Sequence, residues 1–135
     1  MVNSRSTGAA GEREAAKWLQ SKFKLEKAPE RNLEQARSGG FDLIGFPPFA
    51  WEVKRCEQVD KRGWWLQAKT STTDKYSIPV VMFRKNKGKW KFLISVNYIG
   101  LPTGFLQLEE REFILWAKNI LRDLGNESTH NSSII

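Results

Sequence analysis

Two residue types that build many functional sites are almost missing from this chain of 135 residues, which contains one cysteine, Cys56, and one histidine, His130. A single cysteine excludes an internal disulfide, so a reducing cytoplasm is the expected compartment. A single histidine excludes metal centres built from several imidazoles. Because His130 lies in a polar stretch, we also do not expect catalysis by a serine–histidine or cysteine–histidine pair.

Long apolar runs are missing as well. The sequence has no stretch of about 18 apolar residues and no apolar core of a signal peptide, so we expect a soluble, intracellular protein. Positive charge, in contrast, is plentiful. The 22 lysines and arginines exceed the 15 acids, which gives a net charge of +7 and a pI of about 9.7. Such a basic chain favours a polyanionic partner such as nucleic acid.

The sequence patterns predict one α/β domain over residues 1–125, with a central mixed sheet flanked by helices. Six tryptophans and eight phenylalanines supply ample apolar surface for its core. Pro79 indicates an edge strand or a bulge, Gly125 is expected to end the last helix, and residues 126–135 are expected to form a disordered tail. The expected helices span residues 9–24, 64–70 and 108–124, and the expected strands span residues 25–35, 41–46, 49–53, 76–84 and 90–96.

The segment of residues 39–55 combines apolar runs with charge. Its two short apolar runs, separated by a Pro-Pro pair, predict a β-hairpin, yet they contain Asp42, Glu52 and Lys54. Side chains alternate along a strand, so Glu52 and Lys54 share one face. A two-residue turn would place Asp42 on the opposite face. A three-residue loop over residues 46–48 would instead set it across from Glu52, with β-carbons roughly 4.5–5.5 Å apart, which suits two carboxylates that bind one hard cation.

A plainer interpretation places these charges on the solvated face of an edge hairpin, because so short a pattern also occurs by chance. Two features favour a site instead. Glu52 lies within the apolar run Phe-Ala-Trp-Glu-Val, where an unpaired carboxylate would cost on the order of several kcal/mol. The Gly39-Gly40 pair that precedes Asp42 allows the backbone to approach a ligand closely.

Taken in order, these residues resemble the PD-(D/E)XK nuclease superfamily, and they are most similar to archaeal and phage Holliday junction resolvases and related phage endonucleases. The resemblance covers residues 7–96. It implies a restriction-endonuclease-like fold, with the order αβββαββ and a C-terminal helix, in an enzyme that cuts DNA during recombination, repair or phage DNA processing. The motifs that carry it are Gly11-Glu12-Arg13-Glu14, Gly39-Gly40-Phe41-Asp42, Glu52-Val53-Lys54-Arg55, Trp64-Trp65-Leu66-Gln67-Ala68, Ile78-Pro79-Val80 and the basic hairpin Arg84 to Trp90.

The resemblance also implies an active site for phosphodiester hydrolysis. Asp42 and Glu52 would bind Mg²⁺, for which Mn²⁺ would substitute, and the Val53 carbonyl would be a further ligand. Lys54 would position or activate the attacking water. Phe41 stands where the superfamily has a proline, which is a departure from the pattern.

Glu12 and Gln67 extend this implied site. Glu12 would complete the carboxylate set, and Gln67 would hold water or substrate near the metal. On an ideal helix, Glu12 lies within roughly 20–40° of the apolar stripe, whereas Glu14 lies about 140° from Leu19, on the solvent side. Alternatively, Glu12 acts only as a negative charge at a helix N-terminus.

A DNA-binding surface and a homodimer are further implications, because a four-way junction has two equivalent strands to cut. The apolar surface of residues 108–124 is a candidate dimer interface, with core packing as the alternative. In junction resolvases an arginine precedes the aspartate, and the spacing does not decide between Arg31 and Arg37. The expected contacts with DNA are Arg13, Arg31, Arg37, Ser38, Arg55, Arg84, Lys85 and Lys87.

A second functional hypothesis is a non-catalytic nucleic-acid-binding module with a relict nuclease site. The basic cluster of residues 84–89, flanked by Phe83 and Trp90, suits contacts with a nucleic-acid backbone and stacking on bases, although an ordinary solvated turn has the same composition. The complete set of two carboxylates and a lysine favours the enzyme, because a relict site is expected to have lost at least one of them. A third hypothesis is a structural partner protein that uses the last helix as its interface.

Overall fold

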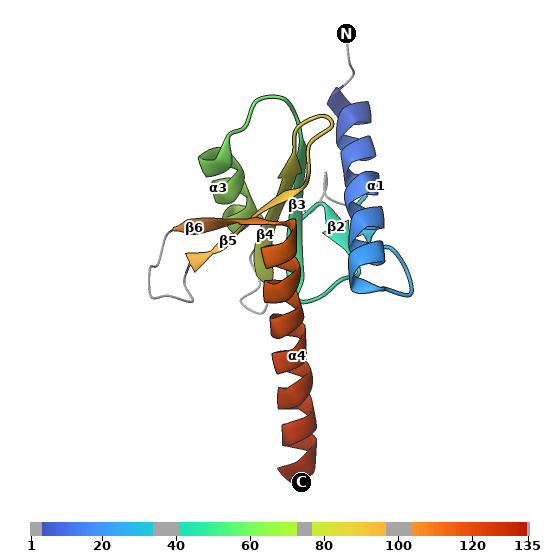
Figure 1. Ribbon diagram of the computed structural model, residues 1–135, viewed down its shortest axis with the longest axis vertical. Helices are drawn as coiled ribbons and strands as arrows, with labels where there is room; N and C mark the ends of the chain where they lie inside the picture. The colour runs from blue at the N-terminus through green and yellow to red at the C-terminus, as the bar shows by residue number, and fades with distance from the viewer. Residues whose placement is uncertain (1–3, 34–40, 73–76, 97–103, 135) are drawn as a thin grey trace.

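The computed structural model describes residues 4–33, 41–72, 77–96 and 104–134, and of residues 4–7 and 126–134 it describes the backbone alone. Within these residues, one six-stranded mixed sheet is flanked by three helices (Figure 1), so the predicted α/β domain with a central mixed sheet is confirmed. The elements are α1 (Ser4–Phe23), β1 (Glu30–Arg31), β2 (Leu43–Ile44), β3 (Phe49–Arg55), α3 (Lys61–Ser71), β4 (Ile78–Arg84), β5 (Lys91–Ser95), β6 (Phe105–Glu109) and α4 (Glu110–Ile134).

The strands follow one another across the sheet in the order of the chain, β1 to β6. Every neighbouring pair is antiparallel except β3 and β4, which are parallel. Parallel strands need a crossover connection, and α3 supplies it on one face of the sheet. None of the described helices is long and apolar enough to cross a membrane.

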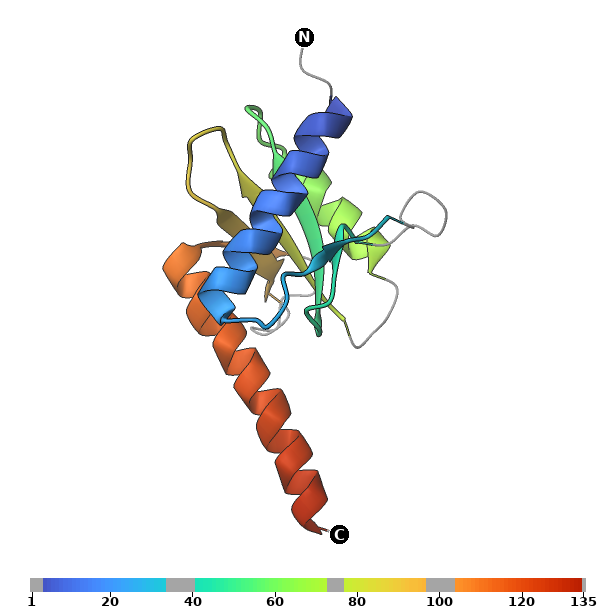
Figure 2. The same ribbon diagram turned by 90° about the vertical axis from the view of Figure 1, so that its right-hand side faces the viewer.

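The helices cover the two faces of the sheet unequally. Figure 2 shows α1 and α4 on one face of the sheet and α3 on the other. Leu19 of α1 and Phe113 of α4 pack with Trp51 of β3 in one core, whereas Trp65 of α3 packs with Val81 of β4 in a second core. Because side chains alternate along β3, Trp51 and Val53 face α1 and α4, while Glu52 and Lys54 face α3. One strand therefore contributes to both cores.

The predicted number of strands was one too low. Residues 105–107 were assigned to no strand and residues 108–109 were expected to begin the last helix, but residues 105–109 form β6, which pairs along its whole length with β5. The physical reason is the pairing itself, because backbone hydrogen bonds to β5 decide the conformation of a short segment with little periodicity of its own. The last helix begins directly after it, at Glu110.

Pro79 was expected to mark an edge or a bulge, and this prediction was wrong. β4 lies inside the sheet, between β3 and β5, and Pro79 pairs with Ala50 in regular parallel register. Pairing with β5 begins only at Val81. Pro79 has no N–H to donate, but it lies before the residues of β4 that bond to β5. A strand tolerates proline at such a position.

Gly125 does not end α4, contrary to expectation. The helix continues through Gly125 to Ile134, so the backbone of residues 126–134, expected to be a disordered tail, is helical. A glycine inside a helix costs only about 1 kcal/mol relative to alanine, and a β-carbon at Gly125 would meet no described atom within 4 Å. Both views show the C-terminal part of α4 projecting away from the sheet (Figures 1 and 2), and the Leu115 side chain is 58% exposed.

Phe113 anchors α4 to the sheet. Its ring is fully buried and stacks on Phe92 of β5, with 3.9 Å between ring centroids and 6° between the planes. It also meets Trp51 of β3 edge-on, with centroids 5.9 Å apart. We therefore expect Phe113→Ala to lower the free energy of unfolding by about 3–5 kcal/mol, which corresponds to a fall in Tm of about 10–20 °C.

Thermal unfolding followed by circular dichroism measures this loss. Lys118→Ala, at an exposed position of the same helix, is the control, and its Tm should stay within about 2 °C of the wild type. Equal losses in the two variants would mean that α4 does not depend on its contact with the sheet.

Candidate functional site

The two acids of the hairpin lie beside each other in the sheet. Leu43 pairs with Trp51, which is the register that a three-residue loop produces. In this register, the residue before Leu43, Asp42, lies across from the residue after Trp51, Glu52. The loop between the strands is closed by the Phe49 N–H, which donates to the Phe46 carbonyl oxygen at 3.3 Å. Asp42 is 6% exposed and Glu52 is 1% exposed, so both carboxylates are buried.

Asp42 is held by the backbone of β3. Its Oδ2 accepts a hydrogen bond from the Val53 N–H at 2.7 Å, and its own N–H donates to the Trp51 carbonyl oxygen at 2.7 Å. The carboxylate thus takes the place of a strand partner just before the start of β2. Its orientation is consequently tied to the backbone of β3.

Glu52 has no comparable partner. Neither of its carboxylate oxygens forms a hydrogen bond with a described residue. Burial and the neighbouring Asp42 charge raise the pKa of Glu52 to about 8, and the Lys54 charge and the nearby Ser71 hydroxyl lower it only in part. At neutral pH this side chain therefore carries a proton unless a cation takes its place.

These donors fit a hard divalent cation. Two carboxylates on facing strands supply anionic oxygens, and those of Glu52 lack a partner among the described residues. In a strand, the N–H and the C=O of one residue point to the same side. The Val53 N–H donates to Asp42, so the Val53 carbonyl also points to the side of β3 on which Asp42 lies. Nowhere in the described ranges do three or more His, Cys, Asp or Glu side chains gather as metal ligands.

Glu12, the expected third carboxylate, lies elsewhere. It is the more buried acid of α1, as predicted, with 16% of its side chain exposed against 37% for Glu14. However, its Oε1 accepts a hydrogen bond from the Arg31 Nε at 2.7 Å. α1 packs on the face of the sheet opposite to the one that Glu52 faces, so the structure does not bring Glu12 into a group with the two hairpin acids.

Glu14 does not point into solvent, and the expectation that it would was wrong. Its carboxylate pairs with Arg55 at the end of β3 and with Arg84 at the end of β4. The Arg84 guanidinium also lies over the Trp90 ring, 5.2 Å from its centroid. Gly11 allows this close approach of α1, because a β-carbon there would lie 3.1 Å from the Arg55 β-carbon.

Gln67 is exposed on α3, and the α3 side chain close to Glu52 is that of Ser71. Ser71 was not among the predicted site residues. The signal that could have revealed it is its position four residues after Gln67, because residues spaced by four lie on one face of a helix.

The expected DNA contacts differ in their surroundings. Arg13, Lys85 and Lys87 are exposed, whereas Arg31, Arg55 and Arg84 form the ion pairs described above. Arg37 and Ser38 lie outside the described residues, so the choice between Arg31 and Arg37 as the arginine that precedes the aspartate stays open.

Comparison with known proteins adds no relative. No family model matches the chain, and no curated protein and no solved structure matches it either.

The raised pKa of Glu52 predicts a link between pH, Mg²⁺ and stability. Its pKa is about 8 in the folded protein against 4.5 for an ordinary glutamate carboxyl, so between pH 4.5 and 8 the folded state holds an extra proton and its stability falls as the pH rises. In EDTA, the Tm of the wild type should fall over this range more steeply than that of Glu52→Gln. At pH 8.5, Mg²⁺ should raise the Tm of the wild type and leave Glu52→Gln nearly unchanged.

Differential scanning fluorimetry over pH 5–9, with Mg²⁺ or EDTA, measures both effects. Glu26→Gln is the control, because Glu26 is an exposed acid, and it should behave like the wild type. An equal response of the wild type and Glu52→Gln to Mg²⁺ would remove Glu52 as a metal ligand.

Glu14 predicts a second, structural effect. Glu14→Gln removes two partly exposed ion pairs and should lower the free energy of unfolding by about 0.5–2 kcal/mol, an effect that 1 M salt should weaken. A double-mutant cycle of Glu14→Gln with Arg55→Gln, read by urea unfolding, should give a positive coupling energy. Additive losses would mean that the Glu14–Arg55 pair contributes nothing to stability.

Proposed function

We propose that this protein is a Mg²⁺-dependent endonuclease that hydrolyses phosphodiester bonds in DNA and selects its substrate by structure, as Holliday junction resolvases do. The observation that carries the proposal is the buried pair of Asp42 and Glu52 on facing strands, with the Glu52 oxygens unpartnered among the described residues. A buried pair of acids is costly for a fold, so it requires a cation or a proton for compensation. The order of sequence motifs that resembles the PD-(D/E)XK superfamily supports the same function.

The chain's own residues have distinct roles in this proposal. Asp42, fixed by the Val53 N–H, and Glu52 hold the metal together with the Val53 carbonyl. When bound, Mg²⁺ lowers the pKa of a water molecule and neutralises charge that develops on the phosphoryl group. Lys54 projects from the same face of β3 as Glu52, where its ammonium group orients the attacking water or holds a phosphate oxygen.

Positive charge near one end of the sheet supports contact with DNA. The hairpin between β4 and β5 carries exposed Lys85 and Lys87, which can approach phosphates without breaking a described ion pair. Arg55 and Arg84 are partly neutralised by Glu14, so they act mainly in holding the hairpin against α1. The exposed Arg13 of α1 adds one more cation.

A homodimer remains part of the proposal, because paired cuts in a four-way junction need two active sites. α4 is the candidate interface. Phe113 and Ala117 are used by the core, whereas Leu115 and Leu124 leave apolar surface exposed for a second copy.

Cleavage of a labelled four-way junction and of a linear duplex, each with Mg²⁺ or with EDTA, tests the enzyme. We expect Mg²⁺-dependent cutting with preference for the junction. Asp42→Asn and Glu52→Gln should each lower the rate by on the order of 10²–10³ or more and should keep DNA binding, because removal of a negative charge does not weaken contact with phosphates.

Glu112→Gln is the matched control, because Glu112 is an exposed acid on α4, and it should cut at the rate of the wild type. Loss of binding in parallel with loss of cutting in the two hairpin variants would contradict the assigned roles.

A non-catalytic nucleic-acid-binding module is the second candidate. The observation in its favour is that Glu12 is engaged by Arg31, so the described residues offer two carboxylates and not three. Binding of the junction without cleavage in either Mg²⁺ or Mn²⁺ would support this candidate over the enzyme.

A further inference from the structure

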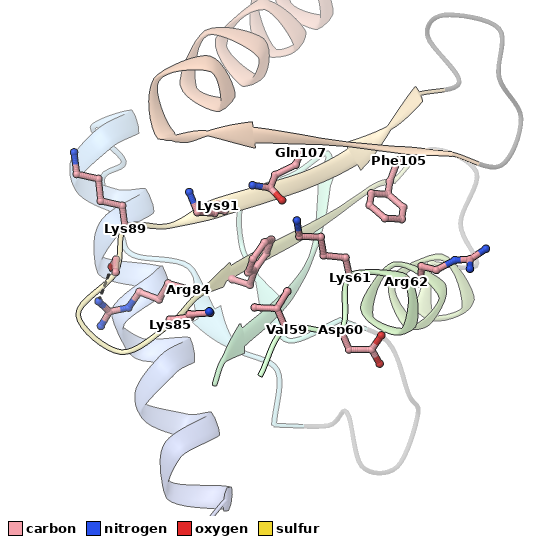
Figure 3. Close-up of a pocket in the computed structure, with 12 residues that line it drawn as sticks. Val59, Asp60, Lys61, Arg62, Arg84, Lys85, Lys89, Lys91, Phe105 and Gln107 are labelled. Carbon is pink, nitrogen blue, oxygen red and sulfur yellow. Dashed lines mark hydrogen bonds between the residues drawn. The ribbon is translucent and has the colours of Figure 1, made fainter. Parts of the chain in front are cut away.

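A pocket of about 780 Å³ opens on the same face of the sheet as Glu52, beyond the N-terminus of α3 (Figure 3). It lies between the start of α3, the end of β4, the following hairpin, and strands β5 and β6. Its size falls within the range of sites that hold small organic molecules. The pocket is separate from the hairpin acids, and only Arg84 and Lys85 of its lining have roles assigned above, as basic residues near DNA.

The lining of the pocket is strongly basic. It contains six cations. Arg84 forms an ion pair with Glu14 and Lys91 forms one with Glu109, whereas the other four cations form no ion pair with a described residue. Asp60 is the one acid of the lining, and it caps α3 by accepting a hydrogen bond from the Gly63 N–H at 3.1 Å. The basic lining residues are Lys61, Arg62, Arg84, Lys85, Lys89 and Lys91.

Apolar groups lie among these cations. Phe83 forms part of the lining, Phe105 is half-buried at the start of β6, and Val59 is 37% exposed. In Figure 3, the Lys85 side chain extends toward Val59 and that of Lys61 toward Gln107. Gln107 also contributes to the lining, and its Oε1 accepts no hydrogen bond from a described residue, so its amide can gain a partner from a bound polar group. Cations, an aromatic ring and an amide together match the parts of a nucleotide.

The pocket also adjoins the proposed catalytic face. Phe83 is the register partner of Lys54, and both side chains point to the α3 side of the sheet. Neighbouring strands lie about 4.8 Å apart, so the pocket begins one strand away from the lysine that is proposed to hold the attacking water.

We propose that this pocket binds an unpaired nucleotide of the DNA substrate, with the base against Phe105 and Val59 and the phosphate near Lys61. This proposal rests on the proposed function, from which it takes DNA as the ligand. The lining of the pocket requires a ligand that carries both a base and a phosphate. Base stacking on an aromatic ring tolerates every base, so the pocket selects unpaired structure and not sequence. Fully paired DNA does not occupy it, because its bases are stacked inside the duplex.

Fluorescence anisotropy with labelled strands in EDTA tests the proposal without any cleavage. The probes are a ten-nucleotide oligothymidine, an abasic strand of equal length and a blunt duplex. The wild type should bind oligothymidine about tenfold more tightly than the abasic strand, and Phe105→Leu should remove most of this difference while it keeps duplex affinity. Equal affinity of the wild type for the two single strands would overturn the assignment of the base.

The charge is tested separately. Lys61→Gln should weaken oligothymidine binding about threefold or more, whereas the charge-matched control Lys118→Gln, on an exposed position of α4, should weaken it less. Equal losses in these two variants would overturn the site. Free thymidine monophosphate should displace the labelled strand only at millimolar concentration, as expected if the pocket binds a nucleotide within a strand. Displacement at micromolar concentration would overturn the proposal in favour of a site for free nucleotides.

The two proposals fail in distinguishable ways. Selective loss of single-strand binding in the pocket variants, in a protein that cuts nothing, would refute the nuclease and support the pocket. Junction cutting that depends on Asp42 and Glu52, with single-strand binding unaffected by Phe105→Leu and Lys61→Gln, would support the nuclease and refute the pocket.

Discussion

The burial of β3 on both faces is the constraint on which the rest of the structure depends. Trp51 points into the core beneath α1 and α4, and the next residue, Glu52, points toward the core beneath α3. A strand in this position has no solvated side on which to place a charge. The carboxylate of Glu52 is consequently both a cost to the fold and the basis of the proposed chemistry, because only a proton or a cation can compensate it there.

α1 adds a second kind of constraint, through charges that act across large separations in the chain. Glu12 binds Arg31 of β1, and Glu14 binds Arg55 of β3 and Arg84 of β4. One helix thus connects three strands of the sheet by ion pairs at its border as well as by apolar contacts at its centre. This arrangement orients the basic hairpin after β4 relative to the hairpin that carries Asp42.

Much of the fold could be predicted because its signals are local. The apolar stripes of α1 and α4 and the apolar runs of β3, β4 and β5 are visible in short windows of sequence. β6 was not predictable in this way, because its conformation depends on β5 as a partner. The course of α4 beyond Gly125 was missed because a single glycine is only a weak helix breaker.

The candidate site was predictable only in part, for the same physical reason. Asp42, Glu52 and Lys54 stand out by their charge, but the adjacency of the two acids depends on the length of a loop, which the sequence left open between two registers. The partners of Glu14 lie 41 and 70 residues away along the chain, so no local pattern could indicate them. The pocket beside α3 combines three separate stretches of the chain, residues 59–62, 83–91 and 105–107, and was not predicted.

The projection of α4 has a consequence for how the molecule moves in solution. At 1.5 Å per residue, its 25 residues form a rod roughly 37 Å long, whereas a compact chain of this size has a radius of gyration of only about 14 Å. A body with such an arm experiences more friction than a sphere of equal mass and tumbles unevenly about its axes. Its elution volume in gel filtration will therefore suggest a mass larger than that of the monomer, even when no second copy is bound.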